Sequence, residues 1–117
     1  MNLVVPDVDA TAQFFIKHFD FKIQTSKVKN LAILHGSDGF VLVISNFPNT
    51  VSYDYPKDFH IGFYQPDHHA VNSLFEKLKE DVANLSGPRN IRDRYGFYFH
   101  APGEIFIEIT CAQSTAL

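Results

Sequence analysis

The sequence predicts an α+β fold made of two tandem modules, each with the order β-α-β-β-β. Three observations support this prediction: a repeated motif, apolar residues at helical spacing after each copy of it, and short apolar segments separated by turn residues. The motif is Pro6-Asp7-x-x-Ala10-x-x-x-Phe14-Phe15, and it recurs sixty positions later as Pro66-Asp67-x-x-Ala70-x-x-x-Leu74-Phe75. The same structural unit is therefore expected twice.

A helix is expected after each Pro-Asp pair, because Asp is a favoured N-cap residue. Its carboxylate accepts hydrogen bonds from the free amides of the first turn and offsets the positive end of the helix dipole. The apolar residues that follow lie at the spacing of one helix face. They are Val8, Ala12, Phe15, Ile16 and Phe19 in the first copy and Val71, Leu74, Phe75 and Leu78 in the second. Asp7 and Asp67 are thus interpreted as structural caps.

Strands are expected on both sides of each helix. In the first module they are expected at residues 3–5, 21–27, 30–35 and 40–45, with a tight turn at Ser37-Asp38-Gly39. In the second they are expected near residues 59–64, 83–86, 95–100 and 105–110, with a turn at Pro102-Gly103. Residues 87–94, which include Arg89, Arg92 and Arg94, are interpreted as a loop that is either solvated or closes over an anionic ligand.

Length and composition favour one domain. A chain of 117 residues suffices for one ordinary domain but not for two independent ones, and 45% apolar residues supply a core. We expect a single domain over residues 1–117, with module one at about 1–46, a linker at 47–57, module two at about 58–111 and a tail at 112–117.

Charge and hydropathy exclude several classes of partner. The net charge is −3 and the ten basic residues are scattered, so no basic stripe is available for nucleic acid. The apolar runs are too short to span a bilayer, and the first residues lack the pattern of a secretory signal. Cys111 is the only cysteine, and its apolar strand context favours a buried, unreactive thiol. These features predict a cytoplasmic protein without nucleic-acid or membrane partners.

The order and spacing of the motifs resemble the vicinal oxygen chelate superfamily, which includes glyoxalase I, bleomycin- and fosfomycin-resistance proteins and ring-cleaving dioxygenases. The matching segments are Val5-Pro6-Asp7 with Phe14-Phe15, Phe59-His60-Ile61-Gly62-Phe63 with Asp67, and Pro102-Gly103-Glu104-Ile105-Phe106-Ile107-Glu108-Ile109. They extend over nearly the whole chain. The resemblance implies a curved mixed sheet around a central cavity, a divalent metal in that cavity and, commonly, a homodimer.

The resemblance also implies metal ligands in the first and last strand of each module. His60 and Glu108 match these positions in the second module, and an imidazole with a carboxylate suits iron, manganese, nickel or zinc. In the first module, the repeat places one ligand before Met1, and aligning Gly39 with Gly103 places Ile44 opposite Glu108. Catalytic sites usually have about three protein ligands, so a complete site would need a start upstream of Met1 or a further ligand.

Period-two alternation along the strands indicates which side chains face the cavity. On the last strand, Phe106, Glu108 and their alternate neighbours are expected on one side, and the isoleucines on the core side. The side chains expected to bind a ligand are Val4, Leu42, Ile44, Tyr64, Tyr98, His100 and Phe106. Apolar walls with a few polar groups are typical of sites for a small aromatic or amphipathic molecule. Glu108 is either a catalytic base there or a purely structural partner of His60.

Three functions remain open. The incomplete ligand set favours metal-free binding of a small molecule, as the drug-sequestering members of the superfamily do. The second function is that of a divalent-metal-dependent lyase or ring-cleaving dioxygenase with Glu108 as a catalytic residue. The third is a degenerate, non-catalytic dimerisation module. The remaining histidines receive structural interpretations: His18 at a helix end, His35 beside a turn, and His68 and His69 in solvent.

Overall fold

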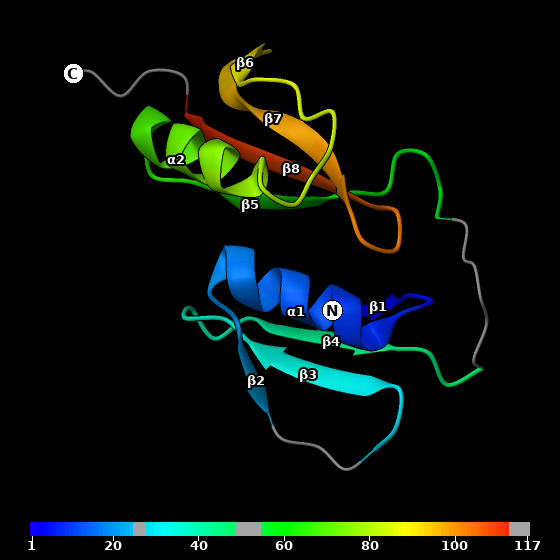
Figure 1. The fold of residues 1–117 in the computed structure, drawn as a ribbon. Coiled ribbons are helices and arrows are strands. Elements are labelled where there is room, and N and C mark those ends of the chain that lie inside the picture. The colour runs from blue at the N-terminus through cyan, green and yellow to red at the C-terminus, as the bar shows by residue number, and fades with distance from the viewer. Residues whose placement is uncertain (25–27, 49–54, 113–117) are drawn as a thin grey trace. The chain divides into compact units, whose positions relative to one another are not determined.

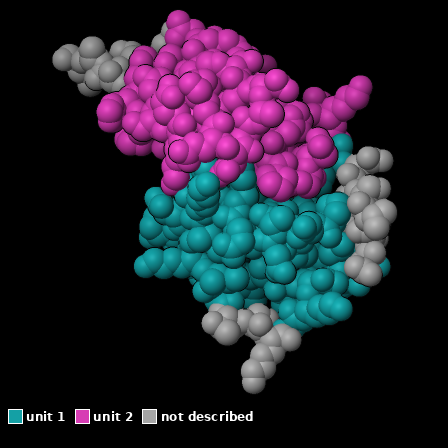
Figure 2. Space-filling model, viewed as in Figure 1, with its two compact units in different colours: residues 1–55 teal, residues 56–117 magenta. Residues whose placement is uncertain are grey.

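The structure, a computed structural model, describes residues 1–24, 28–48 and 55–112. Its elements follow the order β-α-β-β-β twice (Figure 1). The chain divides into two compact units, Met1–Tyr55 and Pro56–Leu117, coloured teal and magenta in Figure 2. The predicted α+β fold with two tandem modules is confirmed, and each module forms its own four-stranded mixed sheet. Residues 49–54 of the predicted linker and 113–117 of the predicted tail lie outside the described residues.

The first unit contains β1 (Asn2–Val4), α1 (Val8–Phe19), β2 (Lys22–Gln24), β3 (Leu31–His35) and β4 (Val41–Ser45). The strand order is β1-β4-β3-β2, in which β1 runs parallel to β4 and the other pairs are antiparallel. Helix α1 packs against β3 and β4. The side chains that fill this core are fully buried: Leu3, Val5, Phe15, Leu34, Leu42 and Ile44.

The second unit contains β5 (Ile61–Tyr64), α2 (His68–Leu78), β6 (Arg89–Ile91), β7 (Arg94–Ala101) and β8 (Ile105–Ala112). Its strand order, β5-β8-β7-β6, repeats that of the first unit, with β5 parallel to β8. Helix α2 packs against β7 and β8. The predicted isoleucine core is confirmed, since Ile105, Ile107 and Ile109 are completely buried.

Both helices begin as the sequence predicts. Asp7 Oδ1 accepts a hydrogen bond from the Ala10 amide at 3.0 Å, and Asp67 Oδ1 accepts one from the Ala70 amide at 2.8 Å. The two Pro-Asp pairs therefore fix equivalent starting points for α1 and α2. Among the described residues, neither helix is long and apolar enough to cross a membrane.

The strand predicted near residues 83–86 is wrong. Asn84 has a φ of 58°, a left-handed conformation that interrupts an extended strand. The strand is instead β6, inside the segment predicted to be a loop. Ile91 pairs with Arg94, so only two residues, Arg92 and Asp93, connect β6 to β7, and Arg92 has a positive φ of 56°. The position of β6 is therefore determined by its tight hairpin with β7 and not by a run of apolar residues.

Gly96 lies where β7 and β8 approach closely. A Cβ at this position would overlap the carbonyl oxygen of Ile109 and lie 2.7 Å from Thr110 Cγ2. Because backbone atoms cannot yield as a flexible side chain does, we expect Gly96→Ala to lower the free energy of unfolding by about 3 kcal/mol or more in urea denaturation. The control is Gly87→Ala, whose Cβ would meet only Phe75 Cζ, at 4.0 Å. Equal stability of the two variants would contradict this close approach.

Candidate functional site

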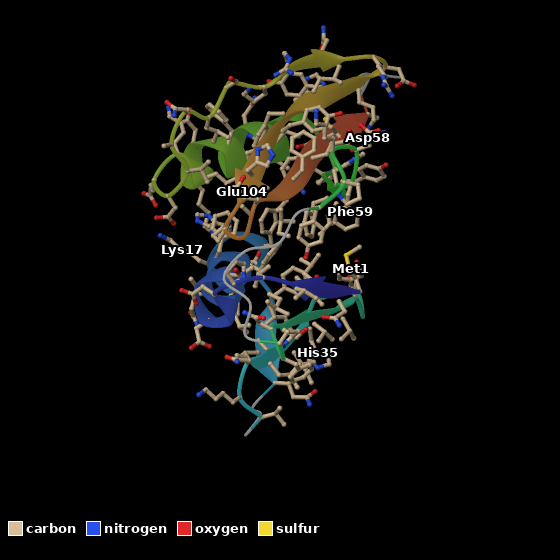
Figure 3. The ribbon with its side chains drawn as sticks, turned by 90° about the vertical axis from the view of Figure 1, so that its right-hand side faces the viewer. Met1, Lys17, His35, Asp58, Phe59 and Glu104 are labelled. Carbon is tan, nitrogen blue, oxygen red and sulfur yellow. The ribbon has the colours of Figure 1, made fainter. Side chains whose placement is uncertain are left out.

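The sheet of the second unit has one face covered by α2 and an opposite face that carries most of the polar side chains. Gly62 and Tyr98 both pair with Glu108, and His100 pairs with Phe106, so their side chains lie on the same side of the sheet. We call this side the open face. It comprises Gly62, Tyr64, Arg94, Tyr98, His100, Phe106, Glu108 and Thr110, with His60 immediately before β5. Figure 3 shows the side chains, with Asp58 and Phe59 on the segment that leads into β5 and Glu104 at the turn between β7 and β8.

Glu108 lies at the centre of the open face. Its side chain is only 15% exposed, and its Oε2 accepts a hydrogen bond from the Tyr98 hydroxyl at 3.2 Å. Its Oε1 lies 3.5 Å from His60 Nε2. A Cβ on Gly62 would lie 3.4 Å from the same Oε1 and 3.5 Å from Tyr64 Cε1, so position 62 lies between the carboxylate and the Tyr64 ring.

His60 is oriented by the backbone before β5. Its Nδ1 lies 2.9 Å from the carbonyl oxygen of Asp58. A carbonyl oxygen can only accept, so Nδ1 carries the hydrogen and Nε2 is the atom that faces Glu108. When the imidazole is protonated, the two side chains form an ion pair. When it is neutral, the lone pair of Nε2 is available to a donor or a cation.

An aromatic row borders this polar group. The rings of Tyr98 and Phe106 are nearly parallel, at 12°, with centroids 5.1 Å apart, and the His100 ring lies 4.8 Å from Phe106. A hollow of about 380 Å³ lies beside the row. It is lined by Val82, Ala83, Asn84, Leu85, Ser86, Tyr98, Phe99, His100 and Phe106. The site thus combines an aromatic surface with a carboxylate, a phenol and two imidazoles.

The Tyr98 hydroxyl has a perturbed acidity. Burial raises the pKa of Tyr98 above its ordinary value of 10.0, and the negative charge of Glu108 and the hydrogen bond to it raise the pKa further. The positive charges of Arg92 and Arg89 act in the opposite direction. Tyr98 therefore keeps its proton, and its role as a donor to Glu108, throughout the neutral range.

The residues predicted from the first module do not share a face. Leu3 pairs with Ile44 and Val4 pairs with Ser45, so Leu42 and Ile44 lie with Leu3 on the buried side of the sheet, while Val4 lies on the other side. The prediction that Val4, Leu42 and Ile44 face the same way is wrong. Val4 lies beside Ser45, and Ser45 follows Ile44 directly on β4. Consecutive residues of a strand point to opposite faces, so Val4 cannot share a face with Ile44 or Leu42.

A one-residue error in the alignment of the turns explains this result. The pair Gly36 and Phe40 closes the first hairpin, as Ala101 and Ile105 close the second, so Gly39 corresponds to Glu104 and not to Gly103. Gly39, Gly103 and Glu104 all have a positive φ, 86°, 83° and 61°, so the strand register decides the match. Val43 is therefore the counterpart of Glu108. Valine cannot bind a metal, so this position supplies no ligand.

The two predicted metal ligands, His60 and Glu108, lie together, with Nε2 and Oε1 3.5 Å apart. Within residues 1–24, 28–48 and 55–112, no group of three or more His, Cys, Asp and Glu side chains is placed to hold a metal ion. Two donors are fewer than the roughly three protein ligands of a typical catalytic centre. The described side chains alone therefore do not fit a catalytic metal ion.

The structure corrects one of the other histidine predictions. His68 is half-buried and stacks on the Tyr95 ring, with centroids 4.1 Å apart at 19°, so the prediction that it lies in solvent is wrong. His69 and His35 are exposed, as expected. Cys111 is buried as predicted, and burial raises the pKa of its thiol, which makes the reactive thiolate scarcer.

The sequence interpretation also missed the position of Arg94. This residue opens β7 rather than belonging to a loop, and its Nε donates to Thr110 Oγ1 at 3.0 Å. The signal was present in the sequence, because Arg94 precedes Gly96, Tyr98 and His100 at intervals of two.

The pKa of Tyr98 provides a test of this geometry. Glu108→Gln keeps the size of the side chain but removes its charge, so we expect the pKa of Tyr98 to fall towards 10, with burial still holding it above that value. Titration of ¹³C-labelled tyrosine by NMR measures this pKa, and Tyr98→Phe assigns the signal. Because folding raises this pKa, the stabilisation that protonated Tyr98 provides is complete below pH 10 and is lost above it.

Glu104→Gln is the matched control, because Glu104 is an exposed residue of the turn. It should leave the pKa of Tyr98 unchanged. If Glu108→Gln also leaves it unchanged, the contact between Tyr98 and Glu108 is not present in solution.

Comparison with known proteins agrees with this architecture. A sequence model of the Glyoxalase/Bleomycin resistance protein/Dioxygenase superfamily matches residues 1–109. A Bacillus cereus protein described as a possible glyoxalase is 32% identical, with a TM-score of 0.82 and 95% of each chain covered.

More distant structures share the fold. The fosfomycin resistance protein FosX of Listeria monocytogenes is 19% identical, with a TM-score of 0.75 over 96% of this chain and 89% of that one. Lactoylglutathione lyase of Agrobacterium tumefaciens is 14% identical, with a TM-score of 0.74 over 100% and 94%. The comparison with curated protein sequences gives no match. The chain belongs to the glyoxalase/bleomycin resistance protein/dioxygenase superfamily.

Proposed function

We propose that this protein binds a small aromatic or amphipathic molecule on the open face of its second unit, and that it does so without a metal. The aromatic row carries the proposal, because Tyr98, Phe106 and His100 present consecutive ring contacts beside the hollow of about 380 Å³. Ligand pockets commonly have volumes of roughly 300–1,000 Å³ and combine apolar surface with few polar groups. A planar ring of the ligand would lie against this row.

The polar groups would orient the bound molecule. A hydroxyl of the ligand could donate to Glu108 Oε1, since the Glu108 side chain keeps 15% of its surface exposed. The Tyr98 hydroxyl already holds Oε2, which fixes the plane of the carboxylate before the ligand binds. Such prior fixing reduces the entropy lost on binding. Glu108 would also be the group that accepts a proton if the bound molecule reacts.

A metal-dependent lyase or ring-cleaving dioxygenase is the second candidate, and one observation favours it. The hydrogen bond from His60 Nδ1 to the Asp58 carbonyl is the arrangement that commonly orients a metal-binding imidazole and leaves Nε2 to the ion. His60 and Glu108 would supply two ligands. The superfamily to which the chain belongs, and the relative described as a possible glyoxalase, support this alternative as well. The metal-free function is supported by the set of two donors that the described part of the chain provides.

The aromatic row can be tested with 2-naphthol, a neutral two-ring probe, in isothermal titration calorimetry. Phe106→Ala removes the central ring of the row, so we expect the affinity for 2-naphthol to fall by about tenfold. The control is Phe47→Ala, which makes the same substitution at a side chain that is 63% exposed in the first unit. Failure of 2-naphthol to bind, or an equal loss in both variants, would contradict the proposed function.

Metal analysis separates the two candidates. The purified, untagged protein would be dialysed and then titrated with nickel, manganese, zinc and iron(II), with metal content measured by mass spectrometry. The metal-free function predicts no stoichiometric metal and no effect of His60→Ala or Glu108→Ala on the metal content. Stoichiometric metal that either substitution abolishes would overturn the metal-free function and establish the second candidate.

A further inference from the structure

The guanidinium of Arg94 makes two contacts on the open face. Its Nε donates to Thr110 Oγ1 at 3.0 Å, and its centre lies 4.4 Å from the centroid of the Tyr64 ring. Thr110 is completely buried, so its hydrogen bond attaches the guanidinium to the sheet. Tyr64 is 71% exposed, and its ring covers one face of the guanidinium. These contacts fix the guanidinium before any ligand arrives, which lowers the entropic cost of binding one.

Among residues 1–24, 28–48 and 55–112, no carboxylate neutralises this group. Within the described residues Arg94 forms no ion pair, and its two Nη groups make no hydrogen bond. Arg89 and Arg92 also have no acidic partner among the described residues. The chain contains 13 Asp and Glu residues, yet none in the described ranges pairs with these three arginines. Guanidinium groups with free Nη donors match the paired oxygens of a carboxylate or phosphate.

A second arginine lies on the same face. Arg89 pairs with Gly96, which stands between Arg94 and Tyr98 on β7, so the register places Arg89 beside Arg94 on the open face. Gly96 has no side chain to separate them. The positive charges of Arg89 and Arg92 act to lower the pKa of Tyr98, although burial and Glu108 raise it by more. The electric field of these two arginines therefore reaches the middle of the open face.

The spacing of the strand residues sets the length of the ligand. The Arg94 side chain reaches back to Thr110, which is two residues from Glu108 and four from Phe106 on β8. At about 3.3 Å per residue, these separations are about 7 Å and 13 Å. A single small ring is too short to contact Phe106 and Arg94 together, whereas a two-ring system with a terminal anionic group has the required length.

We infer that Arg94 binds a terminal carboxylate or phosphate of the ligand, and that the ligand is an extended aromatic anion whose ring lies on the row of Tyr98, Phe106 and His100. This inference rests on the proposed function and names its ligand class. Arg94 is the residue that determines the preference for an anion. Tyr64 and Thr110 are positioning residues that act through Arg94.

Four probes test the inference by isothermal titration calorimetry at one ionic strength: 2-naphthol, 2-naphthoate, 2-naphthyl phosphate and inorganic phosphate. We expect at least one naphthyl anion to bind about tenfold or more tightly than 2-naphthol, since hydrogen bonds to charged groups contribute at this level. The better of the two anions identifies a carboxylate or a phosphate as the preferred group.

Substitutions at Arg94 test whether this residue causes the tighter binding of the naphthyl anions. Arg94→Gln should abolish the advantage of the anions over 2-naphthol, and an unchanged circular dichroism spectrum would show that the variant is folded. Arg94→Lys keeps the charge but loses both the planar fork and the Nε donor, so it should restore only part of the advantage. Lys77→Gln is the control, because it removes one positive charge from an exposed position on α2 and should change nothing.

The outcomes separate this inference from the proposed function. Suppose that 2-naphthol binds and its affinity depends on Phe106. The inference is then overturned, and the proposed function stands, if the naphthyl anions bind no more tightly than 2-naphthol or if Arg94→Gln does not weaken their binding. If inorganic phosphate binds and depends on Arg94 while 2-naphthol does not bind, the anion site stands and the aromatic function fails. If none of the four probes binds, both are overturned.

Discussion

The second unit depends on how a carboxylate is accommodated in the middle of a buried strand. Glu108 lies between Ile107 and Ile109, which are completely buried on the α2 side of the sheet, so the strand cannot shift without exposing its core. A carboxylate so poorly exposed is costly unless it is hydrogen-bonded or paired. The Tyr98 hydroxyl provides the hydrogen bond, and His60 adds an ion pair when it is protonated. Together the three side chains define the centre of the open face.

The same fold gives the two modules different surfaces. In the first unit the counterpart of Glu108 is Val43, and the side of the sheet away from α1 carries apolar residues such as Ile33 and Val41. In the second unit that side carries a carboxylate, a phenol and a guanidinium. The repeat therefore sets the backbone, whereas the chemistry belongs to the second module. This division agrees with the general rule that function depends on a site and not on the fold that carries it.

Local rules in the sequence were sufficient for much of this fold. The Pro-Asp pairs place both helix starts, because capping involves only neighbouring residues, and the alternating isoleucines identify the core side of β8. Strand β6 could not be located in this way, since its position depends on the left-handed conformation of Arg92 and on pairing with β7. These are properties of a hairpin and are not visible as a run of apolar residues.

The candidate site was predicted in part for the same reason. Alternation along single strands brings Tyr98, His100, Phe106 and Glu108 to one face, as the register shows. The assignment of Leu42 and Ile44 to the face of Val4 failed because it depended on aligning two turns of different sequence, where an error of one residue reverses every side chain. Arg94 was assigned to a loop because the predicted strand began at residue 95, although the alternation of Gly96, Tyr98 and His100 extends back to Arg94. Its contact with Thr110 joins residues sixteen positions apart, so no local pattern indicates that contact.

The most direct test of the central claim is to map where an aromatic ligand binds. Backbone amide chemical shifts would be recorded by ¹H–¹⁵N NMR while 2-naphthol is added to the ¹⁵N-labelled protein. If the open face and its hollow are the binding surface, the largest changes will fall on residues 60–64, 82–86, 96–100 and 106–110. Changes confined to the first unit or to α2, with those four segments unaffected, would contradict the claim.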